Sequence, residues 1–84
     1  MSVEPIRIGV VDSGTSAQQT VASSAAFVLQ DGQLWRTEAE PDQLGHGTRI
    51  IEIIQHQMPG ATLFSAQVFS DRLSTTAAQV AAAI

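Results

Sequence analysis

The stretch IRIGVVDSG at residues 6–14, followed by GHGT at residues 45–48, decides how this chain is interpreted. A short β-branched run that ends in aspartate and glycine is typical of a buried strand in a parallel sheet. Its last residue then lies at the carboxyl edge of the sheet, where open α/β sheets gather their functional groups. We therefore expect Asp12 to be a polar group at a strand end, available for chemistry.

The pattern around this strand predicts a β-hairpin, two helices and one further strand. The Asp31-Gly32 pair is a strong signal for a two-residue hairpin turn, and the small polar residues 15–24 are expected to form a loop. The expected elements are strand 6–11, strand 26–29, strand 33–36, a helix from His46 to the stop at Met58, strand 62–69 and helix 75–84. This order predicts an α/β fold with a mainly parallel sheet.

The helix that begins at His46 has an apolar side. Isoleucine and methionine recur near the helical period, and polar residues occupy the opposite side of the helix. We expect the following residues to form the buried side: Ile50, Ile51, Ile53, Ile54 and Met58.

Length and composition limit the class of protein. A chain of 84 residues with no cysteine holds at most one small domain, without disulfides or a thiolate metal site. The net charge of −4, with four scattered basic residues, disfavours a nucleic-acid partner. No apolar run is long enough to span a membrane, so a cytoplasmic protein is expected. The final alanine-rich helix has no return strand, which predicts that residues 1–84 form one incomplete domain.

The segment Gly45-His46-Gly47-Thr48 places a histidine between two glycines at a helix start. Taken alone, it reads as a loop that leads into a helix cap, and Asp12 alone reads as a turn former. Taken together, they offer a carboxylate that orients an imidazole and an imidazole that moves a proton. Thr48 is expected to hydrogen-bond near the helix start and hold it in place.

The two motifs resemble those of subtilisin-like serine peptidases, whose triad occurs in the chain order Asp, His, Ser. The resemblance extends over most of the chain. It implies the N-terminal part of a subtilisin-like three-layer fold and a serine endopeptidase in which Asp12 orients and His46 acts as base and then acid. The nucleophilic serine would lie on the missing remainder or on another chain, since Ser13 reads as a turn hydroxyl. An intracellular peptide-maturation protease acting on one peptide or protein substrate would suit such a chain.

The same resemblance assigns substrate-binding residues near the C-terminal end. Phe69 would border the S2 and S4 subsites, and Leu73, Ser74 and Thr75 would form the edge that pairs with an extended substrate. Thr75 stands near a position where the family commonly has glycine, which would narrow S4 and favour small P4 side chains. No calcium or other metal, and no cofactor, is expected.

Two other interpretations remain open from the sequence. A subtilisin-like chain without the serine could be a non-catalytic peptide-binding module. It could also be an inert fragment whose exposed sheet edge and apolar faces promote aggregation. The pairing of Asp12 with His46 favours the enzyme, because a binding module has no need of that pair.

Overall fold

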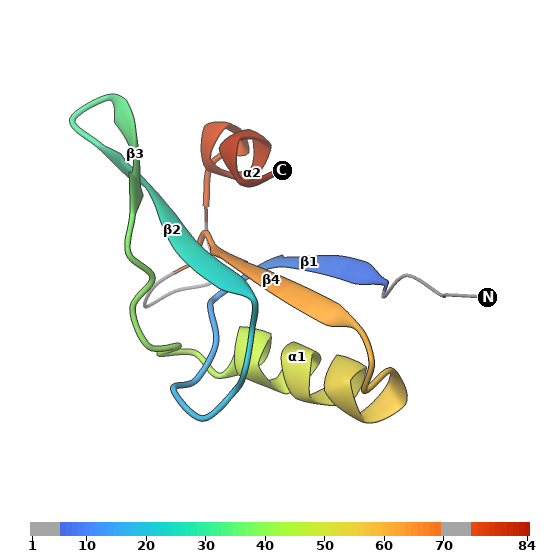
Figure 1. Cartoon of the computed structure of the whole chain (residues 1–84). Coiled ribbons are helices and arrows are strands. Elements are labelled where there is room, and N and C mark those ends of the chain that lie inside the picture. The colour runs from blue at the N-terminus through green and yellow to red at the C-terminus, as the bar shows by residue number, and fades with distance from the viewer. Residues whose placement is uncertain (1–5, 70–74) are drawn as a thin grey trace.

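The chain forms a small mixed α/β domain in a computed structural model that describes residues 6–69 and 75–84. Its elements in order are β1 (Arg7–Asp12), β2 (Ser23–Gln30), β3 (Gln33–Thr37), α1 (His46–Gln57), β4 (Thr62–Gln67) and α2 (Ala77–Ala83). The strands form one sheet in the order β1-β4-β2-β3. Strand β4 pairs in parallel with both β1 and β2, and only the β2–β3 hairpin is antiparallel. The predicted α/β class and mainly parallel sheet are therefore confirmed (Figure 1).

The hairpin turn has the backbone that its sequence predicts. Asp31 and Gly32 have φ angles of 52° and 75°, and two-residue hairpins that match the strand twist need positive φ at both positions. The prediction that residues 15–24 are all loop was wrong at its end, because β2 begins at Ser23. Small residues rarely favour a strand by themselves, but here Ser23 to Ala26 pair with β4, and tertiary pairing overrides local propensity.

Helix α1 packs on one face of the sheet through part of its apolar side. Ile51 is fully buried and forms the core with Val10 of β1 and Leu63 of β4. Ile50 and Ile54 are partly buried against this core. The prediction that Ile53 belongs to the buried side was wrong, since 51% of it is exposed. Ile53 follows Ile51 by about 200° around the helix, which places it away from the sheet.

Met58, also predicted to be buried, is the C-cap residue of α1 and is exposed. Helix α2 begins two residues later than predicted, with Thr76 as its N-cap. Thr76 and Gln79 form a capping box in which each side chain binds the other's backbone N–H. In the described part of the chain, neither helix has the length and hydropathy needed to cross a bilayer.

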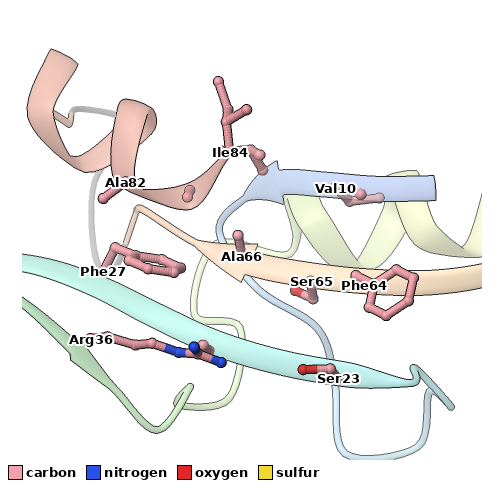
Figure 2. Close-up of a pocket in the computed structure, with 13 residues that line it drawn as sticks. Val10, Ser23, Phe27, Arg36, Phe64, Ser65, Ala66, Ala82 and Ile84 are labelled. Carbon is pink, nitrogen blue, oxygen red and sulfur yellow. The ribbon is translucent and has the colours of Figure 1, made fainter. Parts of the chain in front are cut away.

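The other face of the sheet is only partly covered. Figure 1 shows α2 on the opposite side of the sheet from α1. Helix α2 is tied to β2 by a hydrogen bond from Gln79 Nε2 to the Phe27 carbonyl oxygen (2.8 Å). A hollow of about 330 Å³ remains beside α2, lined by Phe64 and Ala66 of the sheet and by Ile84 (Figure 2). The site described next lies at the carboxyl end of β1 and the start of α1.

Candidate active site

Asp12 and His46 come together where β1 ends and α1 begins. Nδ1 of His46 lies 2.7 Å from Oδ2 and 2.9 Å from Oδ1 of Asp12. The Asp12 side chain is 12% exposed and that of His46 is 56% exposed, so the carboxylate is shielded while the imidazole reaches solvent. The sequence predicted both positions, and the structure places the two side chains in direct contact.

The carboxylate fixes which nitrogen of His46 is free to react. A carboxylate can only accept hydrogen bonds, so Nδ1 of His46 carries the proton that faces Asp12. The N–H of Ser13 donates to Oδ1 of Asp12 at 2.7 Å and holds the carboxylate in place. Among the described residues, Nε2 of His46 has no hydrogen-bond partner, which leaves it available to accept a proton from another group.

Two glycines allow His46 to begin the helix at this point. Gly45, the N-cap of α1, has a φ angle of 81°, a left-handed conformation that glycine adopts without strain. Gly47 packs against the loop after β1, where an added Cβ would lie only 2.2 Å from the Gly14 carbonyl oxygen. The N–H of Gly47 donates to Oγ of Ser13 at 2.9 Å. Ser13 is fully buried in this contact, as expected for a structural hydroxyl.

Asp42 holds the first turn of α1, a role that sequence reasoning missed. Its Oδ1 accepts from the N–H groups of Leu44 (3.1 Å) and Gly45 (3.0 Å). Its Oδ2 accepts from the N–H of Thr48 (2.9 Å) and from the Thr48 hydroxyl (2.6 Å). The expected hydrogen bonding of Thr48 at the helix start is thus confirmed. The available signal was an aspartate shortly before a predicted helix start.

Asp42 gives the helix start a defined pH dependence. Desolvation raises the pKa of Asp42, but hydrogen bonds from the Thr48 hydroxyl and N–H, and from Ser13 and Gly45, outweigh it and lower the pKa from 3.8 to about 2. A carboxyl whose pKa is lower when folded stabilises the fold above its unfolded pKa and loses that contribution as pH falls through its folded pKa. The stabilisation by Asp42 is therefore complete above pH 3.8 and declines toward pH 2.

We expect Asp42→Asn to lower the free energy of unfolding at pH 7 by about 1 kcal/mol, because an amide has one accepting oxygen where the carboxylate has two, and the hydrogen bonds from Thr48 or those from Leu44 and Gly45 lose their acceptor. The difference from the wild type should narrow as pH falls from 3.8 toward 2. Urea unfolding at several pH values measures both effects. Glu38→Gln is the matched control, because the exposed Glu38 side chain makes no hydrogen bond within the described residues. A difference that stays constant with pH would contradict the assignment.

Gln67 is a second buried polar residue that sequence reasoning missed. It is the last residue of β4, and its carboxamide contacts the chain after β1 and the segment before α1. The only sequence signal was its position, since Leu63, Ser65 and Gln67 alternate on the inward face of β4. From sequence alone, a glutamine at the end of such a strand is expected to be exposed to solvent, because the loops that cover it cannot be placed.

The predicted substrate-binding residues are only partly described. The N–H of Phe69 lies 3.4 Å from the Asp12 carbonyl oxygen, which places this half-buried residue beside the dyad formed by Asp12 and His46. Thr75 is also half-buried, and its Oγ1 is buried without a hydrogen-bond partner in the described chain. Leu73 and Ser74 lie outside the described residues. Within residues 6–69 and 75–84, no three histidine or carboxylate side chains are grouped to hold a metal ion.

Comparisons with protein families, with characterised proteins and with solved structures found no match for this chain. The resemblance to subtilisin-like peptidases therefore stays a prediction from the sequence. Because such dyads occur on unrelated folds, their chemistry is argued from geometry.

Proposed function

We propose that the chain supplies Asp12 and His46 to the catalytic triad of a subtilisin-like serine endopeptidase. The observation that supports this most directly is the 2.7 Å contact between Nδ1 of His46 and Oδ2 of a shielded Asp12. Here the ring is more than half exposed, and Nε2 has no partner among the described residues.

In the proposed reaction, His46 first accepts a proton as a base and then donates it as an acid. Nε2 takes the proton of a serine hydroxyl as the oxygen attacks the peptide carbonyl, and Asp12 stabilises the imidazolium that forms. The same nitrogen then gives the proton to the leaving amine. The acyl-enzyme is hydrolysed by water through the same two proton transfers. Asp12 stays ionised throughout and keeps the ring in the required tautomer.

In this proposal the serine approaches Nε2 of His46 from outside the described residues. Ser13 is buried beside Gly47 and is already used as a hydrogen-bond acceptor. In this proposal the nucleophile and the oxyanion donors come from a further part of the same polypeptide or from a second chain. A cytoplasmic role in the maturation of one peptide partner is the finer form of the proposal.

The test is active-site labelling of the protein in which these residues occur naturally. Its intact mass under denaturing conditions first shows which polypeptides are present. A serine-directed fluorophosphonate should then label one serine outside residues 1–84, and His46→Ala should abolish the labelling. His56→Ala is the matched control, since His56 lies in the last turn of α1. If the wild-type protein is not labelled and hydrolyses no peptide, the peptidase proposal fails and a peptide-binding role becomes the better explanation.

Thr75 is expected to restrict the P4 residue of the substrate. By the resemblance, Thr75 stands near a position where the family commonly has glycine, and its β-branched side chain should narrow S4. A library of peptides varied at P4 should show preference for alanine or glycine over phenylalanine, and Thr75→Gly should relax this preference by roughly tenfold, which corresponds to about 1.4 kcal/mol. A wild-type preference for large aromatic P4 residues would refute the assignment.

A further inference from the structure

We propose that Gln67 is a positioning residue that holds the two chain segments carrying Asp12 and His46 in a single arrangement. The inference rests on the proposed function, because the relative placement of these segments affects a reaction only if the dyad takes part in one. Its structural content can nevertheless be measured without any assay of peptide hydrolysis.

The carboxamide of Gln67 makes three hydrogen bonds to backbone groups. Nε2 donates to the carbonyl oxygens of Ser13 (2.9 Å) and Glu40 (3.0 Å). Oε1 accepts from the N–H of Glu40 (3.0 Å). Both donors of the amide are used, and the residue is buried. Gln67 therefore binds two segments of backbone that are far apart in the sequence.

Each of these segments leads directly to one member of the dyad. Ser13 follows Asp12, and its N–H holds the Asp12 carboxylate. Glu40 lies two residues before Asp42, whose carboxylate accepts hydrogen bonds from Thr48 in the first turn of the helix that His46 begins. Gln67 is also the register partner of Asp12 in the pairing of β4 with β1. One side chain, placed within the sheet, thus connects the strand end with the chain that enters α1.

The space around Gln67 leaves its amide little freedom. A Cβ added to Gly14 would lie 2.7 Å from Nε2 of Gln67, so the amide already packs closely against this loop. Asparagine is one methylene shorter and would not reach both segments. Leucine would leave the buried Ser13 carbonyl oxygen without this partner and would remove both hydrogen bonds to the backbone of the exposed Glu40. An unsatisfied buried group destabilises the arrangement that buries it.

The experiment compares Gln67→Leu and Gln67→Asn with the wild-type chain by NMR. The readout is the strongly downfield resonance of the His46 Nδ1 proton, which reports its hydrogen bond to Asp12. Exchange of this proton with water should become at least about tenfold faster in both variants, while amides of β1 and β4 remain protected. Gln55→Leu is the matched control, since Gln55 donates to the Thr20 carbonyl oxygen in an exposed place away from the dyad. It should leave the resonance unchanged.

Two results would overturn the proposal. One is an Nδ1 proton that exchanges at the wild-type rate in folded Gln67→Asn or Gln67→Leu. The other is a general loss of core protection in both variants, which would assign Gln67 a role in stability only. In the serine-containing protein, the variants should lower kcat more than they raise KM. If the wild type proves inactive, the proposed function fails while the NMR comparison still decides whether Gln67 positions the dyad.

Discussion

Asp12→Asn should lower kcat for peptide hydrolysis by about 10⁴-fold while leaving the fold intact. The asparagine oxygen can still accept from the Ser13 N–H, which Asp12 Oδ1 binds at 2.7 Å. Its NH₂ group, however, would donate a hydrogen bond toward Nδ1 of His46. This favours the tautomer of the ring that carries its proton at Nε2. The proton at Nε2 would then prevent His46 from acting as a base. Steady-state kinetics of the serine-containing protein measures the effect.

The matched control for this variant is Asp31→Asn. Asp31 lies in the exposed hairpin turn with a φ angle of 52°, a conformation that asparagine tolerates well. The Asp31→Asn variant should retain the wild-type kcat and KM. Activity of Asp12→Asn within tenfold of the wild type would show that Asp12 does not orient the base.

Gly47→Ala should destabilise the domain by at least about 3 kcal/mol, because the new methyl group meets backbone that cannot move aside. The Cβ would lie 2.2 Å from the Gly14 carbonyl oxygen and 2.9 Å from the Gly14 nitrogen. For a domain of this size, the loss corresponds to a fall in Tm of roughly 12 °C or more. Thermal unfolding followed by circular dichroism measures it.

Gly60→Ala provides the comparison for Gly47→Ala. Among the described residues, no heavy atom beyond the two chain neighbours lies within 4 Å of a Cβ added at Gly60, so the Tm of this variant should stay close to that of the wild type. If the two variants melt at similar temperatures, the close approach between Gly47 and Gly14 is not a determinant of stability.

Much of the fold could be predicted because its signals are local. The β-branched run before Asp12, the Asp31-Gly32 turn and the isoleucine spacing of α1 each depend on a few neighbouring residues. The start of β2 at Ser23 was missed because its pairing with Phe64 of β4 is distant in sequence. Ile53 was wrongly predicted to be buried because the apolar residues of this segment are too many to fit on one face of the helix.

The candidate site was predictable only in the two members of its dyad. Asp12 and His46 stand in recognisable motifs, and the structure brings their side chains together. Asp42 and Gln67 act through hydrogen bonds to backbone, whose partners are set by how loops meet in space. No local sequence pattern predicts how these loops approach each other, so the residues that support the dyad could be identified only from the structure.

The parallel pairing of β1 with β4 has a consequence for the order of folding. It joins residues that are 55 positions apart in the sequence, from Arg7 opposite Thr62 to Asp12 opposite Gln67. Contacts between distant residues close large loops and form later than local ones. The β2–β3 hairpin and helix α1 can form early, whereas Asp12 reaches its place only when β1 joins the sheet. A chain in which β1 has not yet joined the sheet would therefore lack the contact between Asp12 and His46.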